Sequence, residues 1–153
     1  MRESRYDLPC NIAQTLNIIG DRWTLLVLHE ILVGRTTFSD IKKELKGISS
    51  NILSDRLKHL EKAGLVVSSL YSEHPPRYEY SLTESGNQLE DVFNAIIIWG
   101  KSNLDKCYKK IIHSECKHEV ELAYYCPHCD KNVDELDIVA LEETNMTLQK
   151  NNN

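Results

Sequence analysis

The residues best suited to chemistry gather towards the end of the chain, where Cys116 precedes the pair Cys126-Pro-His-Cys129 and is flanked by His113 and His118. A Cys-x-x-Cys turn aims two thiolates at one point, and Zn²⁺ takes four nitrogen or sulfur ligands in a tetrahedron. The pattern predicts a zinc site formed by Cys116, Cys126, Cys129 and one histidine. His113 is the preferred fourth ligand because its spacing to Cys116 repeats that of the Cys-x-x-Cys pair, and His118 is the alternative.

Four protein ligands leave no position for water, so such a zinc would be structural and would fold a segment too short to bury a core. One alternative is a small zinc enzyme with three ligands and a glutamate base, which would be Glu115, Glu119 or Glu121. Another is a reduced, metal-free segment. A redox role for the Cys-x-x-Cys pair is disfavoured, because the βαβ context of thioredoxin-like motifs is absent.

Composition indicates a globular chain, with 41% hydrophobic and 27% charged residues among 153. This length suits one domain plus attachments. No apolar run approaches the roughly 20 residues that cross a bilayer, and the first residues lack the apolar centre of a signal peptide. We therefore expect a cytoplasmic protein, in which five cysteines are poor evidence for disulfides.

Charge is distributed unevenly along the chain. The net charge of −5 argues against a general polyanion binder, because nucleic-acid affinity comes largely from lysine and arginine. Residues 35–77, however, hold eight basic and five acidic side chains, whereas residues 106–153 hold six and nine. The basic excess therefore lies in the middle of the chain.

Four helices are expected before this basic region ends. Apolar residues recur at helical spacing in four segments, which are residues 9–19, 21–33, 37–45 and 49–63. The second is apolar on several sides and belongs in the middle of a core. Ser49 is placed to cap the fourth helix and Gly64 to end it. Two short helices joined by a glycine-containing turn form the helix-turn-helix pattern.

A hairpin and a long helix are expected to follow. Residues 65–71 and 77–82 are β-prone and are separated by a proline-containing tip, residues 72–76. Thr83 is placed to cap one long helix that runs to about Asp105. This helix also carries Ile98 and Trp99, so its apolar surface is wider than one core requires. We interpret the surplus as a homodimer interface, and an ordinary buried helix is the alternative.

The predicted helix at residues 49–63 has a polar face that a DNA groove could accept. Base contacts are expected from its first turns, with Asn51 and Ser54 as the leading residues and Ser49 and Ser50 beside them. Phosphate contacts are expected from a second set of residues, namely Arg56, Lys58, Lys42 or Lys43, and Arg77 after the hairpin tip. A winged-helix adaptor that binds protein instead of DNA is the alternative.

Four motifs in order resemble the HxlR-type family of bacterial transcriptional regulators, a MarR-like group. They are CNIAQTLNIIGDRWTLLVL (residues 10–28), TFSDI (37–41), LSDRLKHLEKAGL (53–65) and YEYSLT (78–83). The resemblance implies a dimeric winged-helix regulator, paired through its terminal helices, that binds pseudo-palindromic operators in double-stranded DNA. The sequence shows no phosphate loop, no nucleophile motif and no paired acid/base constellation, so we expect no catalysis. The resemblance leaves open whether the protein represses or activates.

Cys10 lies at the start of the first predicted helix, where free N–H groups and the helix dipole favour the reactive thiolate. It is therefore a candidate redox sensor, and several members of the similar family sense oxidants or electrophiles at the matching position. The regulator would then respond to thiol oxidation or to a small effector. The alternative is a cysteine that is simply packed against the dimer partner.

Together these patterns predict an α+β fold that is mostly α. Residues 8–105 would form a winged helix-turn-helix domain with a long terminal dimerisation helix, and residues 106–142 a small zinc-ribbon-like β appendix. In that appendix the Cys126–Cys129 turn lies between two β-prone runs, the second at residues 136–141. Residues 143–153 have almost no apolar side chains, and we expect them to be disordered.

Overall fold

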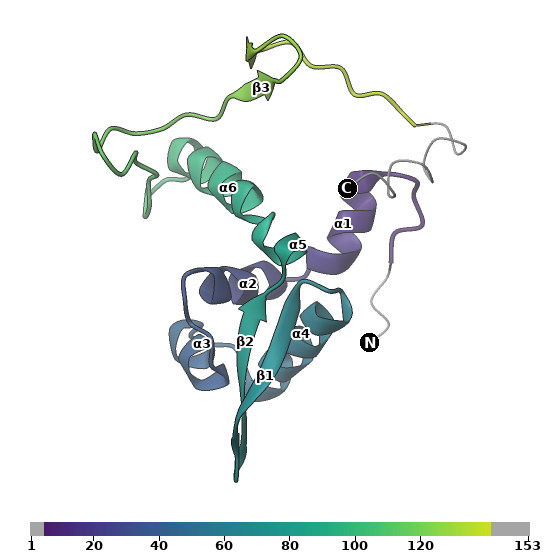
Figure 1. Ribbon diagram of the computed structural model, residues 1–153, viewed down its shortest axis with the longest axis vertical. Helices are drawn as coiled ribbons and strands as arrows, with labels where there is room; N and C mark the ends of the chain where they lie inside the picture. Colours follow the sequence, from purple (N-terminus) through teal and green to yellow (C-terminus); the bar gives the residue numbers. More distant parts are fainter. Residues whose placement is uncertain (1–4, 142–153) are drawn as a thin grey trace. The chain divides into compact units, whose positions relative to one another are not determined.

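The computed structural model describes residues 5–141, which fall into two compact units with the division between Lys109 and Lys110. The expected disordered tail lies outside the described residues. The first unit contains, in order, α1 (Asn11–Ile19), α2 (Thr24–Leu32), α3 (Phe38–Glu44), α4 (Ser50–Lys62), β1 (Val66–Glu73), β2 (Pro76–Leu82), α5 (Glu84–Asn87) and α6 (Glu90–Asn103) (Figure 1). The second contains β3 (Tyr124–Cys126) and β4 (Lys131–Val133). None of the helices described is long and apolar enough to cross a bilayer.

Helix α2 forms the centre of the first unit's core, as its sequence predicts. Val27 and Leu28 are fully buried, and the helix packs against α3, α4 and β2. The leucine stripe of α4 faces the same core, with Leu53 and Leu60 fully buried and Leu57 1% exposed. Each such side chain contributes roughly 1.5–3 kcal/mol through burial of apolar surface.

Local capping signals set the ends of α3 and α4. Thr37 accepts a hydrogen bond from the backbone N–H of Asp40, and Ser49 accepts one from that of Ile52. Gly64 has a φ of +72°, the left-handed conformation that commonly ends a helix. The predicted cap of α4 and its predicted stop are therefore both confirmed.

Asp21 links the start of α2 to α4. Its Oδ1 accepts hydrogen bonds from the backbone N–H groups of Trp23 (2.9 Å) and Thr24 (3.2 Å), and its Oδ2 accepts one from the Thr24 hydroxyl. The Arg56 guanidinium of α4 lies 3.0 Å from the same Oδ2. Partial burial acts to raise the pKa of Asp21, but the hydrogen bonds and the Arg56 charge outweigh it and hold that pKa below its ordinary value.

The hairpin extends further than the sequence indicates. Strands β1 and β2 pair antiparallel from Val66↔Leu82 to Glu73↔Pro76, with an irregularity between Leu70 and Ser72. The predicted tip of residues 72–76 is therefore too long, because pairing resumes beyond that irregularity. The segment before α3 also joins β2, since Tyr80 donates its backbone N–H to the carbonyl of Thr36 (2.7 Å).

One predicted helix proves to be two. The prediction of one continuous helix from Thr83 to Asp105 is wrong, because α5 ends at Asn87 and α6 begins at Glu90. Thr83 does cap α5, accepting from the Gly86 N–H, and its hydroxyl donates to the carbonyl of Gly64. Gly86 is buried so close to the Leu65 carbonyl that a Cβ there would lie 2.2 Å from the oxygen. These contacts hold α5 against Gly64 and Leu65, the two residues before β1.

The second unit contains two short hairpin turns. Strands β3 and β4 pair from Tyr124↔Val133 to Cys126↔Lys131 and enclose the Cys-x-x-Cys turn. The returning strand is thus Lys131–Val133. The prediction of a β-strand at residues 136–141 is wrong, because a tight turn brings the nearest following residues back into pairing before that run is reached.

Candidate nucleic-acid interface

The exposed face of α4 begins at its N-terminal turn. Ser49, Ser50 and Asn51 are exposed there, and Ser54 is half-buried one turn later. The Lys42 ammonium of α3 donates a hydrogen bond to the Ser50 hydroxyl at 2.5 Å. The structure therefore brings the four predicted base-contacting residues and one predicted phosphate-contacting lysine to one end of the helix-turn-helix.

Lys58 and Arg56, predicted to act together, lie in different surroundings. Lys58 is exposed, whereas the Arg56 side chain is only 18% exposed and is ion-paired with Asp21. Arg56 is held in the packing between α4 and the start of α2, so the structure does not group it with the exposed residues of α4. The sequence shows a basic residue at this position but no sign of its distant acidic partner.

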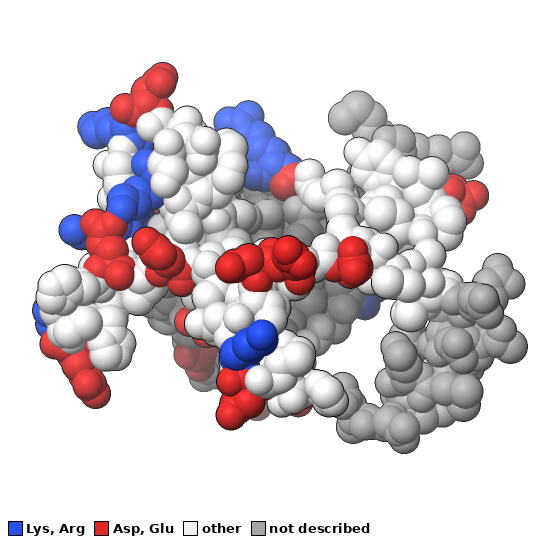
Figure 2. Space-filling view, turned by 90° about the horizontal axis from the view of Figure 1, so that it is seen from above, with Lys and Arg blue, Asp and Glu red and all other residues white. Residues whose placement is uncertain are grey.

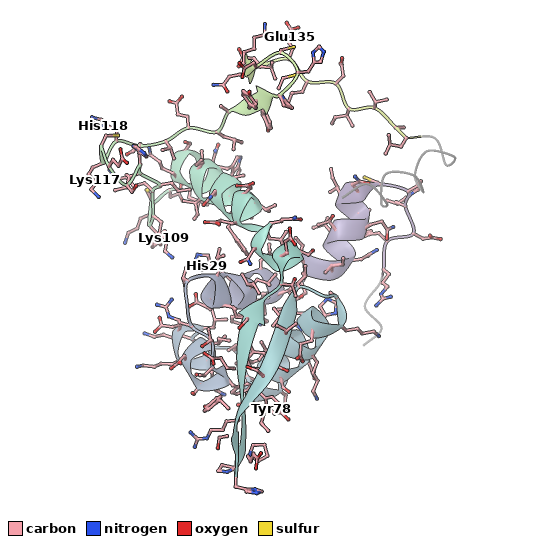
Figure 3. The ribbon with its side chains drawn as sticks, viewed as in Figure 1. His29, Tyr78, Lys109, Lys117, His118 and Glu135 are labelled. Atoms are coloured by element: carbon pink, nitrogen blue, oxygen red, sulfur yellow. The ribbon has the colours of Figure 1, made fainter. Side chains whose placement is uncertain are left out.

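Beside α3, the hairpin forms a groove of about 440 Å³ that the sequence analysis missed. The exposed Arg77 lines it together with five hydroxyl-bearing side chains, those of Thr37, Ser39, Tyr71, Tyr78 and Tyr80. Figure 3 shows Tyr78 on the hairpin below the helices of the first unit. Arginine and hydroxyl side chains are common donors to phosphate oxygens. The many tyrosine, serine and threonine residues at the start of α3 and in the β1–β2 hairpin were the sequence signal that could have indicated this groove.

Charged side chains of both signs lie on the face of the protein that Figure 2 shows. Viewed from above, the protein presents acidic and basic groups beside one another and not a single basic patch (Figure 2). The tip of the β1–β2 hairpin points away from this viewpoint (Figure 1). Because the net charge is −5, any binding to DNA would depend on individually placed cations, such as Lys42, Lys58 and Arg77.

Helices α1 and α6 expose large apolar side chains. Ile12 and Leu16 of α1 are 70% and 44% exposed, and Ile96 and Trp99 of α6 are 49% and 63% exposed. An edge-to-face contact between His29 of α2 and Phe93, with ring centroids 5.6 Å apart, links α6 to α2. Clusters of exposed apolar side chains commonly mark interaction surfaces.

Residues before α1 form an arm along that helix. The side-chain amide of Asn17 pairs with both backbone groups of Tyr6, at 2.7 Å and 2.9 Å, and Gln14 donates to the Leu8 carbonyl at 2.7 Å. A cavity of about 620 Å³ lies among the arm, α1 and the end of α4. Cys10 follows the arm as the exposed N-cap residue of α1, so its thiol is accessible to reagents.

The predicted metal ligands lie in the second unit as two pairs. His113 Nδ1 is 3.2 Å from Cys116 Sγ, and Cys126 and Cys129 share the β3–β4 turn. The backbone N–H and the thiol of Cys129, with the backbone N–H of His128, lower the pKa of Cys126. Within residues 5–141, however, no three histidine, cysteine or acidic side chains gather in a metal-binding group. The zinc site therefore stays a prediction.

Comparisons with known proteins agree on the class. The model of the HxlR-like helix-turn-helix family matches residues 18–108. An uncharacterized HTH-type transcriptional regulator of Mycobacterium bovis is 34% identical over 80% of this chain and 79% of its own length. YtcD of Bacillus subtilis, another uncharacterized HTH-type transcriptional regulator, is 28% identical over 71% of this chain and 84% of its own. The match to the Mycobacterium bovis protein covers more residues than the first unit contains, so this similarity extends into the second unit.

Solved structures show the same relationship. PA1607, a candidate transcription factor, superposes with a TM-score of 0.73 and 26% identity over 90% of this chain and 97% of its own. The redox regulator HypR in its oxidized form gives a TM-score of 0.58 and 33% identity over 63% of this chain and all of its own. The fold predicted from the sequence, a winged helix-turn-helix of the α+β class, is confirmed. The chain belongs to the HxlR-like helix-turn-helix family of transcriptional regulators.

Proposed function

We propose that this regulator acts as a homodimer that reads pseudo-palindromic operator DNA with helix α4. The observation that carries the proposal is the division of α4 into two faces. Its leucines are buried to 1% exposure or less, while Ser49, Ser50 and Asn51 are exposed at the N-terminal turn. The first turns of such a helix are where helix-turn-helix proteins contact base edges.

Within this proposal the side chains have distinct roles. Asn51, with an amide that can pair with adenine, reads sequence, and Ser49, Ser50 and Ser54 supply shorter contacts. Phosphate contacts come from Lys42 of α3, which lies beside Ser50, from Lys58 along α4 and from Arg77 in the hairpin groove. Arg56 is left out of this set because its guanidinium is paired with Asp21. Phosphate contacts fix the register of the protein on the duplex, whereas base contacts select the sequence.

The second copy would pair through the exposed apolar side chains of α1 and α6. Ile12, Leu16, Ile96 and Trp99 would be covered in such a dimer, which removes roughly 25 cal/mol of unfavourable hydration per Å² buried. Pairing also places two α4 helices on one duplex, about 34 Å apart if the half-sites lie one helical turn apart. A symmetric operator would then follow from the symmetry of the protein.

Regulation would act through the segment that joins the arm to α1. Cys10 is exposed at the N-cap of α1, beside the helix surface assigned to dimer pairing. Modification of its thiol by an oxidant or a quinone would alter that surface and thereby the spacing of the two α4 helices. A small effector could act similarly from the cavity under the arm. If treatment with diamide leaves operator affinity unchanged, regulation through the Cys10 thiol is refuted.

Fluorescence anisotropy with duplexes selected from the source genome tests the main proposal. We expect tight binding to a subset of fragments, with an affinity that falls steeply as salt rises because counterions are released. Lys58→Ala should weaken binding and reduce the salt slope by about one unit. Lys62→Ala, at the other end of the same helix, should change neither. Binding that is absent across the library, or independent of salt, would favour the protein-binding adaptor instead.

A further inference from the structure

The turn around Cys116 is a tight hairpin closed by backbone hydrogen bonds. The His113 N–H donates to the carbonyl of His118 at 2.8 Å, and the Val120 N–H donates to that of Ile111 at 3.2 Å. Inside the turn, the Lys117 N–H donates a hydrogen bond to the carbonyl of His113 at 2.9 Å. His113 and Cys116 are thus the two side chains that a four-residue turn presents, and they already approach each other to 3.2 Å.

The turn around Cys129 repeats this construction. It is closed by the pairing of Cys126 with Lys131 and again carries two ligand-type side chains three residues apart. In each turn the residue after the second ligand has a positive φ, +62° at Lys117 and +51° at Asp130. These are the two non-glycine residues with positive φ in the described part of the chain. Left-handed backbone is uncommon outside glycine, so its recurrence at matching positions indicates a shared turn geometry.

Nothing apolar holds these two turns together. Among residues 110–141 no side chain is buried, and Tyr124, Tyr125 and Leu122 are each more than half exposed. A segment of this size cannot bury enough surface to be stable by itself, and such segments commonly depend on a metal or a disulfide. The two turns therefore form ordered ends of a segment that lacks a core.

We propose that His113, Cys116, Cys126 and Cys129 bind one Zn²⁺ and join the two turns into a zinc ribbon. Each turn supplies two ligands, which gives the closed tetrahedral set of a structural site. Only residues 121–123 separate the closed part of the first turn from β3, so the two pairs are neighbours in the chain. The thiols lose their protons as the metal binds, with no change of oxidation state.

Backbone geometry selects His113 over His118. His113 lies within the turn at the position equivalent to Cys126, and its ring nitrogen faces Cys116. His118 follows Lys117, the residue with positive φ, and lies outside the turn on the segment that leaves it. There its carbonyl accepts the hydrogen bond from the His113 N–H. Figure 3 shows His118 beside Lys117 at this turn. The matched pair His113→Ala and His118→Ala therefore tests the ligand assignment.

The full-length protein, prepared with zinc under reducing conditions, provides the test. We expect one zinc per chain by elemental analysis, and replacement by cobalt(II) should give the visible absorption of a tetrahedral site. His113→Ala, Cys116→Ser and Cys126→Ser should each weaken cobalt binding at least tenfold. His118→Ala and Cys107→Ser should leave affinity and spectrum unchanged. His113→Cys should retain a tetrahedral site with all-sulfur absorption.

Three outcomes would overturn the proposal. These are protein without stoichiometric zinc, a His118→Ala variant that binds cobalt as weakly as His113→Ala, and a site with an exchangeable water. The last would indicate an open, three-ligand metal centre like those of zinc enzymes. The readouts measure the metal and are independent of DNA binding, so the zinc proposal and the proposed function can fail separately.

Discussion

Replacing Asp21 with asparagine removes one negative charge from the junction of α2 and α4 while keeping the side chain's size. The asparagine amide retains an oxygen that can accept from the N–H groups of Trp23 and Thr24, so the start of α2 stays capped. The charge opposite Arg56 is lost, with Arg56 only 18% exposed and Asp21 28% exposed. A hydrogen bond to a charged group contributes about 1.5–3 kcal/mol, and partial exposure reduces this through solvent screening. We expect a loss of about 1–2 kcal/mol at neutral pH.

The pH dependence of this loss follows from the pKa of Asp21. That pKa is held below its ordinary value in the folded protein, so ionised Asp21 stabilises the fold above its unfolded pKa of about 4. This contribution disappears as pH falls through the lower, folded pKa. The difference in unfolding free energy between the wild-type protein and Asp21→Asn should therefore be full at neutral pH and should shrink below about pH 4.

Urea unfolding monitored by circular dichroism at several pH values measures both effects. Asp55→Asn is the matched control, because Asp55 is exposed on α4 and a surface substitution of this kind normally changes stability by less than about 0.5 kcal/mol. Equal stability of Asp21→Asn and the wild-type protein at neutral pH would refute the reasoning. A difference that grows towards acid pH would refute it equally, since its sign would require a raised pKa.

Four further substitutions test the fold and the proposed interface. Arg77→Ala should weaken binding to all duplexes by about tenfold and lower the salt slope by about one, as measured by anisotropy. Asn51→Ala should instead reduce the preference for the selected operator by about 1–3 kcal/mol, so an unchanged preference would contradict base contact. Trp99→Glu should convert the dimer to a monomer in analytical ultracentrifugation, and a persistent dimer would exclude α6 from the interface. Gly86→Ala should cost more than about 1 kcal/mol in urea unfolding, because its Cβ would clash with a backbone carbonyl 2.2 Å away.

Sequence patterns were reliable wherever the determinant was local. Helix α4 follows from a serine cap, three leucines at helical spacing and a glycine with positive φ, all within the helix or within two residues of its ends. The hairpin, the central position of α2 and the capping role of Thr83 follow in the same way. Each depends on hydrogen bonds or side-chain periodicity over a few residues, which a short stretch of sequence specifies.

The tertiary structure decided the features that depend on distant partners. From the sequence, Arg56 is expected to be an exposed cation. In the structure it pairs with Asp21, which lies just before α2 and far from Arg56 in the chain. After the hairpin, α5 is fixed where Gly86 meets the Leu65 carbonyl, and the segment before α3 is tied to β2 by the hydrogen bond from Tyr80 to Thr36. Residue type and spacing determined which side chains were available for caps, core and zinc-type turns. Which of them meet depends on chain segments brought together only by packing, because a contact between distant residues leaves no periodic signal in either segment.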